Sequence, residues 1–121
     1  MSASCSPCGV AYATAHANQM LDLYPPAGVI AMAPLIIWMH GGSWRWGSRA
    51  DVPREILALR DDGYAVASLG YRLLDTDASA SSNLFPAQIE DVKTGVRWLR
   101  AHAGDYNLDA SRFVAAGFSA A

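Results

Sequence analysis

The chain has 121 residues, of which 52% are hydrophobic and 17% charged, and its formal net charge is −2. This length suits one small domain, and the apolar share is large enough to build a buried core. The nine lysine and arginine residues are scattered along the chain, which excludes the clustered basic surface of a nucleic-acid-binding protein. We therefore expect a globular domain with no nucleic-acid partner.

The N-terminal residues 1–9 are expected to form a disordered terminus. They contain neither the basic nor the apolar region of a secretory signal, and the apolar stretch 29–39 is too short to span a bilayer. A cytoplasmic protein without a membrane span is therefore predicted. Cys5 and Cys8 lack a second cysteine pair or suitably spaced histidines, so no metal site is predicted. We interpret them as two thiols, with a local disulfide as the alternative.

Three strands are predicted in the first third of the chain. Residues 10–14 fit a short edge strand, and residues 19–24 alternate polar and apolar side chains, which indicates a half-exposed strand. The continuous apolar run 35–39 is typical of a strand that is covered on both faces, as in a parallel sheet. A glycine-containing loop, His40-Gly41-Gly42-Ser43-Trp44, follows this run directly.

A helix and a further strand are predicted next. Asp51 is expected to cap a helix that runs to about residue 61, and Gly63 to end it in a left-handed conformation. Apolar side chains with helical spacing predict the face that packs on the sheet: Val52, Ile56 and Leu59, flanked by Leu57. Residues 64–69 then form another buried strand.

The last third of the chain predicts a loop, a long helix and a final strand. Residues 75–83 are small and polar, which indicates a surface loop. The second helix begins at Pro86 and ends at Gly104, and 105–112 form a turn-rich connector before strand 113–117. The stripe of this helix expected to face the sheet is Ile89, Val92, Val96 and Leu99. This order of elements predicts an α/β fold with a mostly parallel sheet flanked by helices.

The final strand leads into Gly117-Phe118-Ser119-Ala120-Ala121. A sharp turn after a buried strand can lift a serine hydroxyl clear of the sheet, provided that small residues stand two positions before and after it. Gly117 and Ala121 meet this requirement. A serine is a weak nucleophile until a base removes its proton. The pattern therefore predicts Ser119 as a nucleophile that needs a partner base.

The segment His40-Gly41-Gly42-Ser43-Trp44 can supply the complementary part of such a site. Attack on an ester carbonyl creates an oxyanion, which backbone N–H groups stabilise. Glycines allow the main chain to approach the substrate closely. Taken alone, this segment is equally consistent with an ordinary glycine-rich turn. Trp44 and Trp46 either line a substrate pocket or pack beneath the loop.

These motifs together resemble the α/β-hydrolases, specifically the esterase/lipase branch related to hormone-sensitive lipase and bacterial feruloyl-esterase-like proteins. The resemblance covers residues 12–121. Its carriers are Leu21-Asp22-Leu23-Tyr24-Pro25, His40-Gly41-Gly42-Ser43-Trp44, Tyr64-Ala65-Val66-Ala67-Ser68, Tyr71-Arg72-Leu73, Phe85-Pro86-Ala87-Gln88-Ile89-Glu90-Asp91, Trp98-Leu99 and Gly117-Phe118-Ser119-Ala120.

The resemblance implies a role for each matching position. Ser119 resembles the nucleophile, and the N–H groups of Gly42, Ser43 and Ala120 resemble the oxyanion hole. The motifs are supported by His40, Gly41, Trp44 and Gly117, with His40 in a structural role. Tyr71-Arg72 and Asp91 are expected to hold the scaffold. The resemblance implies no cofactor and no metal. The chain departs from the family in having Ser43 and Ala121 where glycines are usual.

In this family the acid and the histidine of the triad follow the serine. His16, His40 and His102 all precede Ser119, and His102 is interpreted as a structural residue at a helix end. We therefore expect the N-terminal portion of an α/β-hydrolase fold, truncated at the nucleophile elbow, inactive alone and poorly soluble. Its parent is expected to hydrolyse small-molecule carboxylic esters through an acyl-enzyme.

Three alternatives stay open beside the esterase. The first two are a peptidase and an arylformamidase of the same fold, which share the elbow. The third is a noncatalytic binding protein on the same scaffold. The sequence indicates no oligomeric state and no particular acyl or alcohol group.

Overall fold

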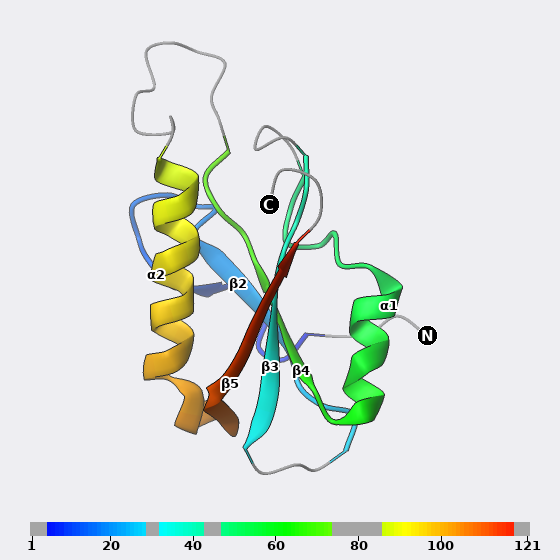
Figure 1. The fold of residues 1–121 in the computed structure, drawn as a ribbon. Coiled ribbons are helices and arrows are strands. Elements are labelled where there is room, and N and C mark those ends of the chain that lie inside the picture. Colours follow the sequence, from blue (N-terminus) through cyan, green and yellow to red (C-terminus); the bar gives the residue numbers. More distant parts are fainter. Residues whose placement is uncertain (1–4, 29–31, 43–46, 74–85, 118–121) are drawn as a thin grey trace, which may run out of the picture.

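A five-stranded sheet forms the centre of the computed structural model (Figure 1), which describes residues 5–28, 32–42, 47–73 and 86–117. The strands are β1 (Val10–Ala11), β2 (Met20–Tyr24), β3 (Ala33–Met39), β4 (Ala65–Leu69) and β5 (Leu108–Gly117). They lie in the order β1-β2-β4-β3-β5. Strands β4, β3 and β5 are parallel, whereas β1 pairs with β2 and β2 with β4 in antiparallel fashion. The predicted parallel arrangement thus holds for the three strands nearest the two motifs.

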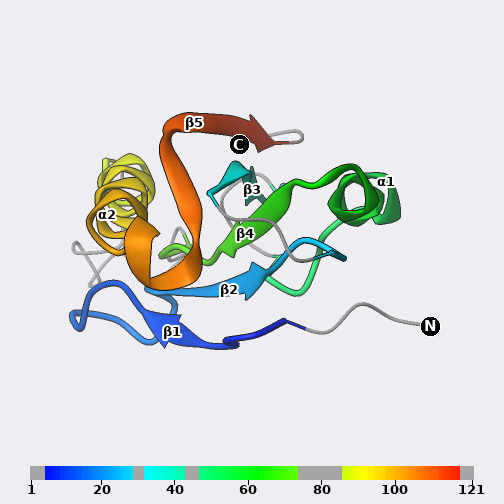
Figure 2. The same ribbon diagram turned by 90° about the horizontal axis from the view of Figure 1, so that it is seen from below.

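Two helical segments cover opposite sides of this sheet. Helix α2 (Ala87–Ala101) lies on one side, and on the other lies α1 (Arg54–Leu57), which continues as a 3₁₀ helix, Ala58–Asp62. Figure 2 shows the strands stacked between them. The predicted α/β fold, a sheet flanked by helices, is therefore confirmed. No helix in the described ranges is long and apolar enough to cross a membrane.

Successive side chains of a strand point to opposite faces, so each face of the sheet has its own core. The core on the α2 side is the larger one and comprises Tyr12, Leu21, Leu23, Ala33, Leu35, Ile37, Ala65, Ala67, Leu69, Leu99, Ala103 and Leu108. The core on the α1 side comprises Tyr24, Ile36, Trp38 and Val66, with partly buried side chains of α1 packed against it.

Strand β2 is more buried than its alternating sequence predicts. Every residue of β2 after Met20 is buried, so the predicted half-exposed strand is wrong. The N–H of Ser6 donates to the carbonyl oxygen of Leu23 at 2.6 Å, and the N–H of Leu23 donates to that of Pro7 at 3.0 Å. Residues 5–9 therefore pack along β2 instead of forming a disordered terminus; residues 1–4 lie outside the described ranges.

The two cysteines of this N-terminal segment form a disulfide, with their Cα atoms 5.2 Å apart. The interpretation as two free thiols is wrong, and the alternative of a local disulfide is confirmed. Cys5 also packs against the core on the α1 side of the sheet. This contact helps to cover the face of β2 that the sequence pattern left exposed.

Helix α2 packs on the sheet through part of the predicted stripe, since Leu99 is buried in the core and Val96 packs against it. Ile89 is 39% exposed, so its assignment to the buried face is wrong. The buried positions of the helix are Ala87, Gln88, Asp91, Gly95 and Leu99. A Cβ at Gly95 would lie 2.4 Å from Cδ2 of Leu69, so the missing side chain brings the helix close to β4. Apolar periodicity gives no signal for the glycine and the two polar side chains of this face, Gly95, Gln88 and Asp91.

The first helical segment confirms the predicted extent and end, but not the predicted cap. Gly63 ends it with φ of 92°, in the left-handed region. The N-cap is Pro53, without a side-chain hydrogen bond, so the assignment of Asp51 as the cap is wrong. The Asp51 carboxylate instead accepts the N–H of Ser48 at 2.9 Å. The predicted apolar face of this helical segment packs against the core on the α1 side of the sheet.

The chain between α2 and β5 also differs from the prediction. Gly104 lies inside a 3₁₀ turn, and the left-handed residue that ends this turn is Asn107, with φ of 56°. Strand β5 begins at Leu108, five residues before the expected start. Its register against β3 is interrupted between these points, where Asp109 accepts hydrogen bonds from Ser111. These polar, turn-forming residues conceal the start of the strand.

Strand β5 is the outermost described strand on its side of the sheet. Val114, in its middle, is 56% exposed. The predicted loop over residues 75–83 lies outside the described ranges, as does the turn after Gly117.

Candidate active site

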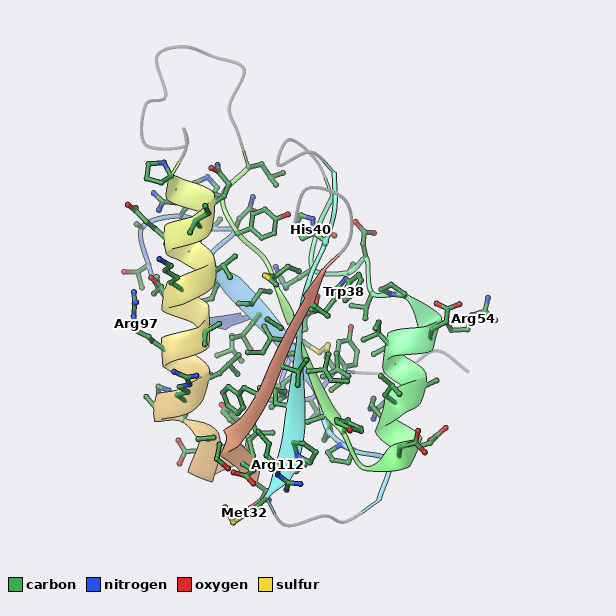
Figure 3. All side chains as sticks on the ribbon, viewed as in Figure 1. Met32, Trp38, His40, Arg54, Arg97 and Arg112 are labelled. Carbon is green, nitrogen blue, oxygen red and sulfur yellow. A yellow bond between two sulfur atoms is a disulfide. The ribbon has the colours of Figure 1, made fainter. Side chains whose placement is uncertain are left out.

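The two sequence motifs meet at one edge of the sheet. Strands β3 and β5 are parallel neighbours, and their last paired residues are Met39 and Gly117. The two strands that precede the motifs therefore end side by side. Ligands of open α/β sheets bind beyond the carboxyl ends of the strands. Figure 3 shows His40 at this end of β3 and Met32 at the other.

Four predicted site residues lie outside the described ranges: Ser43, Trp44, Ser119 and Ala120. Trp46, the second proposed pocket residue, does as well. Their assigned roles remain predictions. The described site residues are His40, Gly41, Gly42 and Gly117, and these occupy the two strand ends that the motifs require.

His40 is held inside the protein by contacts on both sides of its ring. Its side chain is 2% exposed, and Nδ1–H donates to the carbonyl oxygen of Gly41 at 2.9 Å. The ring stacks on Tyr71 with centroids 4.4 Å apart and planes 8° from parallel. The Tyr71 hydroxyl donates to the carbonyl oxygen of His40 at 2.5 Å, and burial raises the pKa of Tyr71. These contacts are those of a ring bonded within its own loop, as expected for the predicted structural role of His40.

Glycines shape both ends of the loop. Gly42 has φ of 122° and Gly47 has φ of 93°, conformations that glycine adopts without a steric penalty. A Cβ at Gly47 would lie 2.5 Å from the carbonyl oxygen of Gly41 and 2.6 Å from Nδ1 of His40. The returning chain therefore packs directly on the outgoing chain. Gly47 was missed from the sequence, although a glycine closing the Trp-rich loop was an available signal.

A buried ion pair fixes the segment that carries Tyr71. Arg72 and Asp91 pair at 2.8 Å, and the N–H of Arg72 donates to Oδ2 of the same carboxylate at 2.8 Å. The Gln19 amide also donates to Asp91, at 2.8 Å. The hydrogen bonds that its guanidinium donates to Asp91 raise the pKa of Arg72 above its usual value. The predicted scaffold role of Arg72 and Asp91 is confirmed, since they connect α2 to the chain that carries Tyr71 and, through Gln19, to the residue before β2.

A second ion pair holds the returning chain and was not found from the sequence. Arg49 Nε donates to Asp22 Oδ1 at 3.0 Å, and the hydroxyl of Ser68 donates to the carbonyl oxygen of Arg49 at 2.6 Å. Asp22 also accepts the N–H of Gly9 at 2.7 Å. The available signal was an aspartate between two leucines in a strand.

A pocket of about 40 Å³ lies behind the loop, between the chain after β3 and the chain after β4. Its lining residues are Asn18, His40, Gly47, Ser48, Arg49, Gly70 and Tyr71. This volume accommodates a few water molecules but no ester substrate.

The other two histidines make local contacts. His102 Nδ1–H donates to the carbonyl oxygen of Trp98 at 2.8 Å, and the two rings stack with centroids 3.9 Å apart. This confirms the structural interpretation of His102 at the end of α2. His16 Nδ1 accepts the N–H of Asn18 at 3.0 Å.

Comparison with known proteins identifies the family. The BD-FAE family model matches residues 21–121. Esterase LipC of Mycobacterium tuberculosis is 35% identical over 89 residues, which are 73% of this chain and 21% of LipC. A solved structure described as a truncated form of a carbohydrate esterase from gut microbiota superposes with a TM-score of 0.79 at 30% identity, over 93% of this chain and 38% of that one.

Esterase B from Lactobacillus Rhamnosis gives a TM-score of 0.75 at 30% identity, over 93% of this chain and 35% of that one. The chain thus spans about a fifth of the length of LipC and about a third of Esterase B. The match in sequence covers both motifs, and the match in structure covers the sheet that brings their strands together. The chain belongs to the BD-FAE family, an esterase family within the esterase/lipase branch of the α/β-hydrolases.

Proposed function

We propose that the complete protein is a serine carboxylesterase with Ser119 as its nucleophile. The observation that carries this proposal is the parallel pairing of Met39 with Gly117. Neighbouring strands lie about 4.8 Å apart, so the loop after β3 and the turn after β5 begin within reach of one substrate carbonyl. An acyl-transfer site needs this arrangement, because nucleophile and oxyanion donors act on the same group.

The oxyanion hole is proposed to consist of the backbone N–H groups of Gly42, Ser43 and Ala120. The positive φ of Gly42 supports this role, because the outgoing chain turns there without a side chain that would obstruct a substrate. His40 and Gly41 hold the start of the loop, Trp44 supports its far part, and Gly117 gives the elbow room. One such donor typically contributes about 10²–10³-fold to kcat.

In the proposed reaction, Ser119 Oγ attacks the ester carbonyl carbon while its proton passes to a general base. The tetrahedral oxyanion then collapses, the alcohol leaves, and water hydrolyses the acyl-enzyme. The base is proposed to belong to the part of the protein that the relatives contain and this chain does not cover. No cofactor enters this sequence of steps.

Cytoplasmic location stays a prediction from the sequence. The Cys5–Cys8 disulfide favours an oxidising compartment instead, since cytosolic thiols are usually kept reduced.

The test compares the complete wild-type protein with Ser119→Ala on p-nitrophenyl acetate and butyrate. Loss of the nucleophile is expected to lower kcat by about 10⁴-fold or more. Ser111→Ala is the matched control, because Ser111 is an exposed serine of β5 and its loss should leave turnover unchanged. Turnover that survives Ser119→Ala would sink the esterase assignment. A serine-dependent cleavage of peptides or formamides, but not esters, would support the alternatives of the same fold.

A further inference from the structure

Residues 47–51 (the return segment) follow the oxyanion loop. They are held through Arg49, by both its side chain and its backbone carbonyl group. The guanidinium of Arg49 pairs with Asp22 of β2 at 3.0 Å, and its carbonyl oxygen accepts the hydroxyl of Ser68 of β4 at 2.6 Å. The segment is further tied to β3, where the indole N–H of Trp38 donates to the carbonyl oxygen of Asp51 at 3.1 Å. Three strands therefore hold the return segment from the α1 side of the sheet.

The carboxylate of Asp22 is oriented toward Arg49 by a second hydrogen bond. Its Oδ1 accepts both the N–H of Gly9 and Nε of Arg49, so two donors orient one carboxylate oxygen. Gly9 has φ of 62°, and a Cβ there would lie 3.4 Å from Nη2 of Arg49. The N-terminal segment thus packs against the guanidinium as well as the carboxylate.

The return segment passes this constraint to the oxyanion loop by direct backbone contact. Gly47 lies two residues before Arg49, against the carbonyl oxygen of Gly41 and the ring of His40. A packed contact of this kind transmits displacement instead of absorbing it. A shift of Arg49 would therefore move Gly41 and, with it, the N–H of Gly42.

We infer that Asp22 and Arg49 form a positioning pair that sets the place of residues 40–42, the first part of the oxyanion loop, without touching substrate. The inference rests on the proposed function of that loop. The side chains of Arg49 and Asp22 are 33% and 11% exposed, and solvent-screened pairs contribute little to global stability. The effect of removing the pair should therefore appear in the loop more than in the fold.

The experiment uses the complete protein with Arg49→Met, Asp22→Asn, the double variant and Arg49→Lys. With p-nitrophenyl butyrate, each single variant is expected to lose about 10- to 100-fold in kcat, because misplaced donors act on the transition state. KM should change less than about threefold. The double variant should be no worse than either single one, and Arg49→Lys should recover part of the loss. Arg112→Met is the matched control, since its exposed pair with Asp109 lies at the opposite end of the sheet (Figure 3).

Amide hydrogen exchange gives a readout that does not depend on catalysis. Exchange over residues 40–42 should accelerate at least about tenfold in Arg49→Met and stay unchanged in Arg112→Met. An unchanged kcat in an active enzyme, or unchanged exchange at residues 40–42, overturns the positioning role. If activity falls only in proportion to a lower Tm, the positioning role is also overturned, because the pair then acts through the stability of the whole fold. Failure of the proposed function is seen separately, as hydrolysis that does not require Ser119.

Discussion

Each face of the sheet carries an apolar core and an Arg–Asp ion pair, but the two pairs differ in their exposure to solvent. The α2 face carries the larger apolar core and the Arg72–Asp91 pair, in which Asp91 is 1% exposed. On the α1 face a smaller core lies beside the Asp22–Arg49 pair, which solvent reaches. The first pair joins helix α2 to the chain after β4, and Gln19, just before β2, bonds to the same carboxylate. The second pair joins strand β2 to the return segment.

This difference in exposure predicts that one pair mainly affects stability and the other mainly affects activity. Breaking a buried pair leaves an uncompensated charge inside the protein and is strongly destabilising. Breaking a partly exposed pair changes the free energy of unfolding little but frees the segment that it held. Substitutions on the α2 face should therefore lower stability, and substitutions around Arg49 should lower activity in a folded protein.

The sharpest test of this division is Arg72→Leu. Because Asp91 stays behind as a buried charge, the free energy of unfolding is expected to fall by about 3–5 kcal/mol, as measured by urea denaturation. Arg112→Leu removes an arginine from an exposed pair and should leave the unfolding midpoint close to that of the wild type. Similar midpoints for the two variants would contradict the proposed contrast between the faces.

A smaller loss is expected for Gly95→Ala in α2. The new methyl group would overlap Cδ2 of Leu69, and such overpacking costs about 1–3 kcal/mol, which thermal denaturation can measure. Gly104→Ala is the matched control, because nothing lies within 4 Å of a Cβ at that position. If the two substitutions shifted Tm equally, close packing of α2 on β4 would not be what stabilises this face.

The smallest effect concerns alkaline pH. Burial, followed by the nearby charge of Asp91, raises the pKa of Tyr12 well above its usual value of 10.0. The native state therefore holds this proton more tightly than the unfolded chain, so the stabilisation is complete below pH 10 and is lost as the pH rises. Between pH 9 and 11 the loss amounts to about 1.4 kcal/mol.

Urea denaturation at both pH values measures this loss, and Tyr12→Phe should make the decline shallower because phenylalanine has no proton to lose. Tyr12→Phe also removes the hydrogen bond from the Tyr12 hydroxyl to the carbonyl oxygen of Gly70, which measures 2.7 Å. The stability of the variant at pH 11 is therefore compared with its own stability at pH 9. An equally steep decline in Tyr12→Phe would show that other groups control alkaline unfolding.

Local patterns were sufficient to predict the elements that bury apolar side chains. The run 35–39 predicted a covered strand, and it lies between two parallel neighbours. Such runs carry their own signal, because burial on both faces leaves no polar positions. The conjunction of this strand with Gly117 then located the candidate site.

What the sequence could not predict depends on partners far apart in the chain. Asp22 and Arg49 meet only after β2 and the return segment fold against each other. The sequence around each residue does not predict its partner. The buried face of α2 was only partly predicted for the same reason, since Asp91 is buried because Arg72 and Gln19 bond to it. Polar burial is decided by tertiary partners.

The pairing of Met39 with Gly117 also bears on the order in which the domain folds. It joins positions 78 residues apart in the chain (117 − 39), whereas β1 and β2 pair within a hairpin. Contacts between distant positions pay a larger loop-closure entropy and form late. The edge that holds the candidate site should therefore assemble after most of the sheet, so a protein with much of its strand content can still lack a working site.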